Sequence, residues 1–206
     1  MSNCYYSNLE AWLVENMAPN QRIMVNRYIY DEHRDLLRNL FDECFVVSYN
    51  EEFYKFLGKF TTALIHINDE FVGAFAFFGH AAPLRCSLKV SRRLSSLFAP
   101  RASCLYLSEI AVRQNFRNLG LGSLIIEQWI KYYNDTVDIF YCHVKCNNEA
   151  AIRFYERHQF IQCSVERGVY NSSDCHDAFV MVLNTRPSIY NVKKKITARF
   201  MEWVSD

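Results

Sequence analysis

The most informative segment of this chain is Arg117-Asn118-Leu119-Gly120-Leu121-Gly122. It follows an apolar, strand-like segment at 104–112 and opens an amphipathic helix. The first turn of a helix has backbone N–H groups without intrahelical partners, and these lie at the positive end of the helix dipole. Such a junction can bind a pyrophosphate, because glycines let the phosphate approach the backbone. The sequence therefore predicts a site for a phosphate-bearing cofactor between a strand and a helix.

The spacing of the glycines differs from that of the two commonest nucleotide loops. No Lys-Ser/Thr pair follows Gly122, and the dinucleotide fingerprint needs three glycines. An Arg/Gln-x-x-Gly-x-Gly/Ala loop resembles instead the acyl-coenzyme A loop of the GNAT acetyltransferase superfamily. This resemblance implies an α/β protein with the GNAT fold, a mixed central β-sheet splayed around acetyl-CoA and flanked by helices.

Two further blocks carry the resemblance. Residues 140–144 read as a buried strand, 147–157 as a capped helix and 160–163 as another strand, which is similar to the second half of the GNAT coenzyme site. Residues 45–54 resemble the substrate loop of the eukaryotic N-terminal acetyltransferases of the Naa50/Naa60 type, which act on starting methionines. The blocks stand in the family's order and span most of the chain.

The composition is that of a soluble globular protein. The chain has 206 residues, of which 50% are hydrophobic and 22% charged, and a net charge of +1 gives little steering toward nucleic acid. No stretch is long enough to span a membrane, and the start lacks a secretory pattern. The eight cysteines form no C-x-x-C pair, which predicts a reducing, cytoplasmic location. Cys142, His143 and Cys146 could ligate a metal, but a zinc site needs a second close pair, so no metal is expected.

The chain divides into three predicted parts. Residues 1–20 form an N-terminal extension, 21–186 the acetyltransferase domain and 187–206 a C-terminal amphipathic helix. A basic loop inserted at about 80–103 is either a solvated insertion or an electrostatic contact with a ribosome, an acidic partner or membrane headgroups. The terminal helix either docks on the domain or makes peripheral contact with the cytosolic face of a membrane.

The elements around the cofactor strand follow from periodicity. We expect a first strand at 22–29, a helix capped by Asp31, and a hairpin of 60–67 with 71–78. Gly73 marks a bulge or a close approach of the backbone. A last strand is expected at 177–183.

The chemistry of acetyl transfer indicates what the site needs. Transfer from a thioester to an amine requires a neutral amine, a donor to the carbonyl oxygen and a proton for the departing thiolate. An N-terminal α-amine titrates near pH ~8 and lysine near ~10.4, so an α-amine needs less help from a base. The resemblance assigns that help to Tyr106 and His143, which match the residues that relay the amine proton through water. By residue type alone, a core tyrosine and a buried strand histidine are the structural alternatives.

Glu109 is the second candidate base. Strand alternation sends Tyr106 and Ile110 to one face and Glu109 to the other, unless a bulge intervenes. Many GNAT enzymes carry a carboxylate here on a bulged strand, so both assignments stay open.

The resemblance also assigns the coenzyme contacts. Tyr155 matches the tyrosine that reaches the coenzyme sulfur and can supply its proton, and Asn148 matches the asparagine that contacts the pantetheine arm. A helix N-cap alone would also explain Asn148. The other predicted cofactor residues are Ile110, Val112, Arg117, Asn118, Leu119, Gly120, Leu121, Gly122 and Ser123.

The predicted peptide site departs from the family in two places. Where relatives have Phe-Pro-Val/Ile-x-Tyr, this chain has Val46, which frees the backbone and restores an N–H. A family Tyr-Tyr pair corresponds to Val169-Tyr170, which leaves only Tyr170 to cover the peptide. The apolar residues Phe45, Val47 and Tyr49 are expected to receive a methionine side chain. The full predicted substrate set is Phe45, Val47, Tyr49, Tyr106, His143 and Tyr170.

These assignments predict Nα-acetylation of proteins that begin with methionine and a hydrophobic residue. A lysine or polyamine acetyltransferase is the nearest alternative; it would need acidic residues near the amine entry, where Glu51 and Glu52 are the candidates. A non-catalytic acetyl-CoA-binding partner subunit is the second alternative. The sequence leaves the oligomeric state open.

Overall fold

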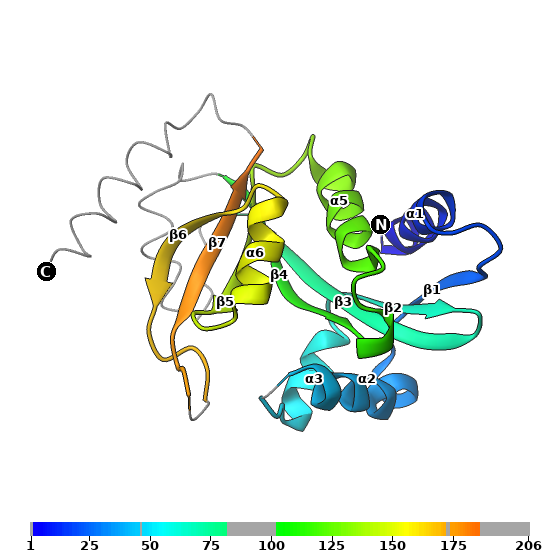
Figure 1. Cartoon of the computed structure of the whole chain (residues 1–206), viewed down its shortest axis with the longest axis horizontal. Helices are drawn as coiled ribbons and strands as arrows, with labels where there is room; N and C mark the ends of the chain where they lie inside the picture. Colours follow the sequence, from blue (N-terminus) through cyan, green and yellow to red (C-terminus); the bar gives the residue numbers. More distant parts are fainter. Residues whose placement is uncertain (1, 46, 82–101, 172–173, 186–206) are drawn as a thin grey trace, which may run out of the picture. The chain divides into compact units, whose positions relative to one another are not determined.

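Seven β-strands form a mixed sheet in the order β1-β2-β3-β4-β5-β7-β6, flanked by helices (Figure 1). The computed structural model describes residues 2–45, 47–81, 102–171 and 174–185. The chain divides into unit 1, Met1–Phe78 with Leu107–Tyr133, and unit 2, Gly79–Tyr106 with Asn134–Asp206. The elements are α1 (Ser2–Asn16), β1 (Ile23–Arg27), α2 (Tyr30–Cys44), α3 (Glu51–Leu57), β2 (Thr61–Ile67), β3 (Glu70–Ala81), β4 (Ser103–Val112), the 3-10 turn η1 (Gln114–Phe116), α5 (Leu121–Tyr133), β5 (Ile139–Lys145), α6 (Glu149–Arg157), β6 (Ile161–Glu166) and β7 (Ala178–Asn184).

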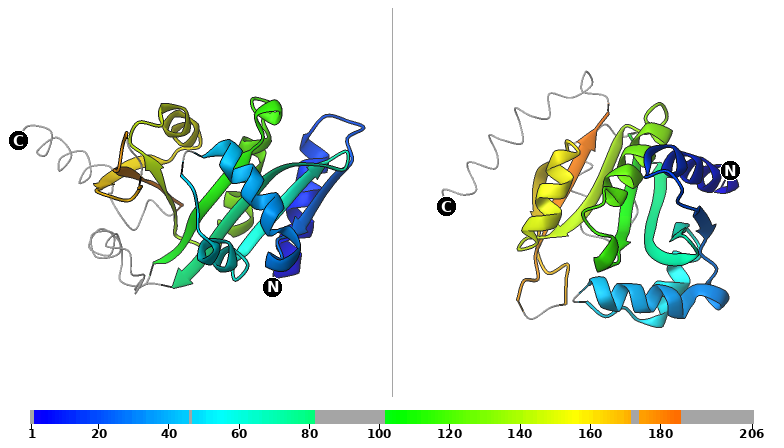
Figure 2. Two further views of the ribbon diagram at one scale, coloured as in Figure 1. Left: turned by 90° about the horizontal axis from the view of Figure 1, so that it is seen from below. Right: turned by 45° about the vertical axis from the view of Figure 1, so that its right-hand side comes forward.

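Strand β3 shows how unit 1 fills both faces of its part of the sheet. Ala74 and Ala76 belong to an apolar cluster with buried side chains of α2 and α3. Phe75 and Phe77 contact Trp129 of α5, each with ring centroids 5.6 Å apart. Helices α2 and α3 cover one face of this part of the sheet and α5 covers the other (Figure 2). Because side chains alternate along a strand, the alanines face α2 and α3 and the phenylalanines face α5.

Helix α1 is an element that the sequence analysis did not predict. Tyr5, Leu9 and Leu13 recur every fourth residue and are almost fully buried. The indole Nε1 of Trp12 donates a hydrogen bond to the carbonyl of Leu124 at 3.1 Å, so α1 packs beside α5 (Figure 1). Residues within the predicted N-terminal extension therefore contribute to the core of unit 1.

The predicted hairpin is present, and Gly73 has the predicted role. β2 and β3 pair antiparallel, and the register shifts between Ile65 and His66, whose partners are Gly73 and Phe71. The one residue left over on β3 makes a bulge. A Cβ at Gly73 would lie 2.7 Å from the carbonyl oxygen of Ala111, so β4 approaches too closely for any larger residue.

The prediction that Asp31 caps α2 was wrong. The N-cap residue is Ile29, without a side-chain cap hydrogen bond, and Asp31 lies inside the first turn. The backbone N–H of Ile29 donates to Nδ1 of His33 at 2.9 Å. A histidine four residues along thus satisfies a donor at this helix start, and Asp31 still lies favourably near the positive end of the helix dipole.

Strand β5 divides the side chains of unit 2 between two faces. Ile139 and Tyr141 lie in an apolar cluster with residues of β4, β6 and β7, and Tyr106 packs against it. His143 follows Tyr141 on the same face. Cys142 points to the opposite face, where it forms a hydrogen bond with Tyr155 of α6. The strand therefore keeps His143 and Tyr155 on different sides.

Two predicted segments fall on residues that the structure does not describe. These are residues 82–101, most of the basic loop, and 187–206, the C-terminal helix. Among the described residues, none of the helices combines the length and the apolar character that crossing a membrane requires.

Candidate active site

The glycine loop of unit 1 contains a residue in the left-handed backbone region. Gly120 has φ +85°, and a Cβ built there would meet no atom within 4 Å. Helix α5 begins at Leu121, and the N–H of Leu124 already donates to the carbonyl of Gly120 at 3.0 Å. Leu121 and Ile125 are buried and hold the loop from behind. Because the first turn of α5 carries no acidic residue, the loop suits an anionic phosphate.

Arg117 links this loop to the end of β4. Its Nε donates a hydrogen bond to the carbonyl of Val112 at 2.8 Å, and the thiol of Cys44 lies 3.5 Å from the same oxygen. Asn118, the next residue, adopts φ +62°, and Leu119 is 63% exposed. The predicted cofactor loop is therefore fixed at both of its ends, while its tip faces solvent.

In unit 2 the two predicted proton-relay residues form a hydrogen bond. Nδ1 of His143 lies 3.1 Å from the hydroxyl of Tyr106. Nε2 of His143 lies 3.0 Å from Oε2 of Glu166, on β6. The side chain of His143 is 5% exposed and that of Glu166 is 17% exposed, so the three groups form a mostly buried chain. Tyr170 joins it, since its hydroxyl donates to the backbone carbonyl of His143 at 3.2 Å.

The hydrogen bonds determine where His143 carries its proton. Burial lowers the pKa of His143, and the carboxylate of Glu166 acts against this effect. The imidazole is therefore neutral at pH 7, with one N–H. A carboxylate can only accept, so Nε2 carries the proton and Nδ1 accepts the Tyr106 hydroxyl. Protein groups thus engage both ring nitrogens, and no group of three His, Cys, Asp or Glu side chains in the described parts of the chain could hold a metal ion.

Glu109 lies in unit 1, in a different environment. Its Oε1 accepts a hydrogen bond from the hydroxyl of Tyr49 at 3.3 Å. Burial raises the pKa of Glu109 to about 8, and the Tyr49 hydrogen bond only partly opposes this. The raised pKa favours the protonated carboxyl group at neutral pH, and in that form it cannot accept a proton.

The predicted peptide residues of unit 1 belong to an aromatic cluster. Tyr49 stacks on Phe53 with ring centroids 4.0 Å apart, and Phe45 contacts Tyr49 edge to face at 6.2 Å. Phe45, Val47 and Tyr49 are all partly exposed. They occupy every second position between α2 and α3, and Asn50 caps α3 through a hydrogen bond from the N–H of Phe53.

The two predicted coenzyme residues of α6 have partners within unit 2. The side-chain oxygen of Asn148 accepts the N–H of Ala151 at 3.1 Å, so the N-cap reading of this residue is confirmed. Tyr155 is 6% exposed and bonds with the buried thiol of Cys142. The structure therefore brings together Tyr106, His143 and Tyr170 in one place, Tyr49 and Glu109 in another, and Asn148 and Tyr155 on α6.

The model of the Acetyltransferase (GNAT) family matches residues 29–160, which include the hairpin, the glycine loop and both candidate bases. The chain belongs to the GNAT acetyltransferase family. It is 26% identical over 147 residues to N-alpha-acetyltransferase 60 of Xenopus tropicalis, covering 66% of this chain and 59% of that protein. It is 27% identical over 154 residues to N-alpha-acetyltransferase 50 of Danio rerio, covering 73% of this chain and 82% of that protein.

Solved structures of the GNAT family share the fold. Arabidopsis thaliana Naa50 in complex with the bisubstrate analogue CoA-Ac-MVNAL aligns with TM-score 0.63 at 23% identity, over 79% of this chain and 98% of that chain. Arabidopsis thaliana NAA60 in complex with acetyl-CoA aligns with TM-score 0.61 at 19% identity, over 79% of this chain and 99% of that chain. The predicted fold class is therefore confirmed.

Glu166 is the residue of this GNAT chain that sequence reasoning missed. The strand predicted from the sequence ends at Cys163, whereas β6 continues to Glu166 with a register shift between Gln162 and Ser164. The bulge turns Glu166 to the face that carries His143. An acidic residue at a strand end gives no sequence signal for such a contact.

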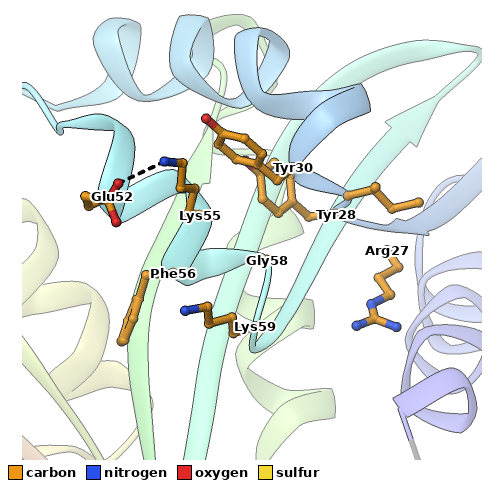
Figure 3. Close-up of a pocket in the computed structure, with 9 residues that line it drawn as sticks. Arg27, Tyr28, Tyr30, Glu52, Lys55, Phe56, Gly58 and Lys59 are labelled. Atoms are coloured by element: carbon orange, nitrogen blue, oxygen red, sulfur yellow. Dashed lines mark hydrogen bonds and ion pairs between the residues drawn. The ribbon is translucent and has the colours of Figure 1, made fainter.

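A pocket of about 820 Å³ in unit 1 contains none of the predicted catalytic or cofactor residues (Figure 3). Its lining mixes exposed cations with the exposed apolar side chains of Ile29 and Phe56. Lys55 is paired with Glu52 at 2.9 Å. Its lining residues are Arg27, Tyr28, Ile29, Tyr30, Glu52, Lys55, Phe56, Gly58 and Lys59.

Proposed function

We propose that this GNAT protein is an acetyl-CoA-dependent N-terminal acetyltransferase that modifies the α-amine of proteins starting with methionine and a hydrophobic residue. The observation that carries the proposal is the hydrogen bond of 3.1 Å between the Tyr106 hydroxyl and Nδ1 of His143, on the neighbouring strands β4 and β5. The names of the two relatives, N-alpha-acetyltransferases 50 and 60, support the same reaction.

Acetyl-CoA fits the residues of the loop before α5. The positive φ of Gly120, the absence of acidic residues from the first turn of α5 and the fixed position of Arg117 suit a pyrophosphate. The residues that would hold the coenzyme are those of the loop from Arg117 to Ser123, the strand residues Ile110 and Val112, and Asn148. The bound group supplies an acetyl thioester. Tyr155 is the proposed proton donor to the coenzyme sulfur.

Tyr106 and His143 are the residues that we propose transfer the amine proton. The hydroxyl oxygen of Tyr106 accepts the amine proton through water, and its own proton passes to Nδ1 of His143. This step needs a neutral imidazole with a free lone pair on Nδ1. Burial favours the neutral form of His143, and the hydrogen bond to Glu166 keeps its proton on Nε2. An α-amine with a pKa near ~8 is partly neutral at pH 7, so a weak relay is sufficient.

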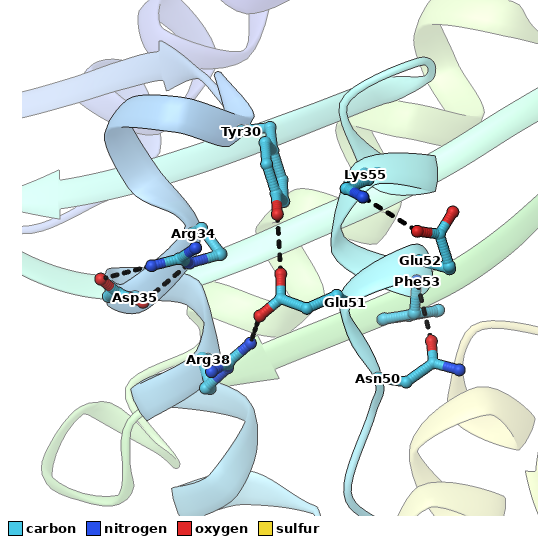
Figure 4. A network of polar contacts seen from close by, with 9 residues as sticks. All are labelled: Tyr30, Arg34, Asp35, Arg38, Asn50, Glu51, Glu52, Phe53 and Lys55. Carbon is cyan, nitrogen blue, oxygen red and sulfur yellow. Dashed lines mark hydrogen bonds and ion pairs between the residues drawn. The ribbon is translucent and has the colours of Figure 1, made fainter.

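The paired state of two glutamates supports an α-amine substrate over lysine. Glu51 accepts a hydrogen bond from the Tyr30 hydroxyl at 2.7 Å and forms an ion pair with Arg38 (Figure 4). Both contacts lower the pKa of Glu51. Glu52 pairs with Lys55 at 2.9 Å. The two candidates for attracting a lysine or polyamine cation are therefore neutralised by the protein itself.

The aromatic segment between α2 and α3 supports the preference for methionine. Phe45, Val47 and Tyr49 present partly exposed apolar surface on a backbone that is fixed by the Asn50 cap. A methionine side chain fits such a surface because its thioether is apolar and contacts aromatic rings favourably. Tyr170, which is anchored to the backbone of His143, is the proposed cover over the peptide.

Turnover of acetyl-CoA against a peptide panel tests the proposal. Peptides would begin Met-Leu, Met-Val, Ala-Leu or Ser-Leu, and an Nα-blocked lysine peptide serves as control. We expect the highest kcat/KM for Met-Leu and none for the blocked peptide. Preference for the blocked peptide would establish the lysine acetyltransferase, and coenzyme binding without turnover of any amine would establish the non-catalytic subunit.

We further propose a cytoplasmic enzyme. Seven free cysteines among the described residues are consistent with a reducing compartment. Contact with a membrane through 187–206 stays a prediction from the sequence, since these residues lie outside the described ones. Sedimentation with anionic liposomes, for the full chain and for a chain cut after residue 186, tests it.

A further inference from the structure

Glu166 ends the buried chain of hydrogen bonds that begins at Tyr106. We propose that Glu166 is a positioning residue: it holds His143 in the tautomer with the proton on Nε2, and its charge stabilises the imidazolium that forms when Nδ1 takes the Tyr106 proton. This inference rests on the proposed function, because it assigns Glu166 to the same proton relay.

The distances support a single arrangement of protons. Oε2 of Glu166 lies 3.0 Å from Nε2, and the Tyr106 hydroxyl lies 3.1 Å from Nδ1. In the other tautomer Nε2 would carry a lone pair that faces the Glu166 carboxylate, and the N–H of Nδ1 would have to donate to the hydroxyl oxygen of Tyr106. That arrangement places two acceptors against each other in a mostly buried site, which costs free energy.

The register of the sheet explains how Glu166 reaches a histidine two strands away. β7 lies between β5 and β6, and Ala178 of β7 is opposite Glu166 on one side and Lys145 on the other. His143 is opposite Val180, so all of these side chains lie on one face. Ala178 is small and fully buried, which leaves room for the Glu166 side chain to extend across β7.

Lys145 is the cation that could have competed for Glu166. It shares this face and is opposite the same residue of β7. Its ammonium instead pairs with Asp174, which also accepts a hydrogen bond from Asn147 at 2.8 Å. The carboxylate of Glu166 therefore pairs with His143, while Lys145 pairs with Asp174.

The proton balance of the relay follows from these contacts. Tyr106 gains the proton of the amine on its oxygen and loses its own to Nδ1, so Tyr106 ends neutral and His143 carries one positive charge. That charge lies against the negative charge of Glu166. Without Glu166 the same transfer would leave an unpaired cation in a site where His143 is 5% exposed.

NMR of the full chain labelled with ¹⁵N-histidine reads the tautomer directly and needs no substrate. In the wild type we expect a protonated Nε2 and an unprotonated Nδ1 for His143, assigned by loss of the signal in His143→Ala. Glu166→Ala should give a mixture of tautomers. Glu166→Gln keeps an acceptor oxygen but no charge, so it should keep the tautomer. Glu156→Gln, an exposed glutamate of α6, is the matched control.

Kinetics of the same variants give the second readout. We expect Glu166→Gln to lower kcat by about 10-fold and Glu166→Ala by up to about 10²-fold, with the KM for acetyl-CoA unchanged. Glu156→Gln should match the wild type. The isosteric Glu166→Gln keeps the test valid if Glu166→Ala fails to fold.

Failure of this inference and failure of the proposed function have different signatures. An unchanged tautomer in Glu166→Ala, or a wild-type kcat in Glu166→Gln, overturns the role of Glu166 while the enzyme remains an N-terminal acetyltransferase. A wild type that acetylates no α-amine overturns the proposed function, and the relay role of Glu166 with it, even if the tautomer responds to Glu166→Ala.

Discussion

Glu109 in unit 1 and Glu166 in unit 2 are both partly buried carboxyl groups within hydrogen-bond distance of a ring side chain. Glu109 has one such contact, the Tyr49 hydroxyl at 3.3 Å, and burial raises its pKa to about 8. Glu166 accepts a hydrogen bond from His143 at 3.0 Å, and His143 in turn accepts from Tyr106. Burial thus favours the neutral form of Glu109, whereas Glu166 holds the proton of His143 on Nε2 and is proposed to stabilise the imidazolium. The surroundings, rather than the residue type, decide which glutamate serves proton transfer.

The largest effect should come from breaking the relay of unit 2. We predict that Tyr106→Phe and His143→Ala each lower kcat by roughly 10²-fold or more, because each removes a group that is proposed to transfer the amine proton. The KM for acetyl-CoA should change little. Steady-state kinetics with a Met-Leu peptide measure both constants.

Glu109→Gln is the contrasting variant in unit 1. Since the carboxyl group is already mostly protonated at pH 7, we expect kcat to fall by no more than about threefold. A Glu109→Gln defect far larger than those of Tyr106→Phe and His143→Ala would move the base to Glu109. Wild-type rates in all three variants would remove both sites from the mechanism.

Two glycines, one in each unit, separate backbone strain from coenzyme binding. Gly120 has φ +85° and Gly168 has φ +68°, and neither would bring a Cβ within 4 Å of another atom. Alanine at either position should therefore cost a similar ~1 kcal/mol of stability from backbone strain. Only Gly120→Ala should weaken acetyl-CoA binding, by about tenfold, as measured by calorimetry. An equal loss of affinity in both variants would mean that the loop before α5 does not hold the coenzyme.

The raised pKa of Glu109 has a consequence for stability. In the folded chain the Glu109 carboxyl group keeps its proton up to about pH 8, whereas in the unfolded chain it loses the proton near its usual pKa of 4.5. The stabilisation is complete below about pH 4.5 and is lost as the pH rises to about 8. Glu109→Gln cannot ionise, so the Tm of the wild type should fall relative to the variant by a few degrees between pH 5 and 8. A difference in Tm between the wild type and Glu109→Gln that does not vary with pH would contradict the raised pKa.

The sequence was most informative where local chemistry alone determines the structure. Gly120 has to adopt a positive φ, Gly73 has to admit the carbonyl of Ala111, and Asn148 caps the helix that follows it. Each of these is a short-range constraint that leaves a residue type in the sequence.

The sequence was least informative where partners are distant in the chain. Helix α1 is buried because it packs on α5 and β1, and the spacing of Leu9 and Leu13 in the sequence does not say which elements cover them. Glu166 reaches His143 only because β6 contains a bulge and the intervening Ala178 is small. Asp31 looked like a cap, but His33 satisfies the donor of Ile29 instead. Tertiary packing determines these contacts, and a local sequence pattern does not predict them.

A tyrosine-to-phenylalanine substitution in each unit, at Tyr49 and at Tyr106, tests the comparison most selectively, and the effect expected at Tyr49 is the smallest. Tyr106→Phe removes a hydroxyl that bonds with a neutral histidine, whereas Tyr49→Phe removes one that bonds with Glu109 and keeps the ring that is proposed to contact the peptide. We predict that Tyr49→Phe changes kcat by no more than about threefold. Because the Tyr49 hydrogen bond lowers the pKa of Glu109, its loss should move the pH midpoint of the Glu109 stability effect upward. Thermal melts of Tyr49→Phe and the wild type from pH 6 to 10 measure this shift, and a midpoint that moves downward would show that the hydroxyl stabilises the neutral rather than the charged form of Glu109.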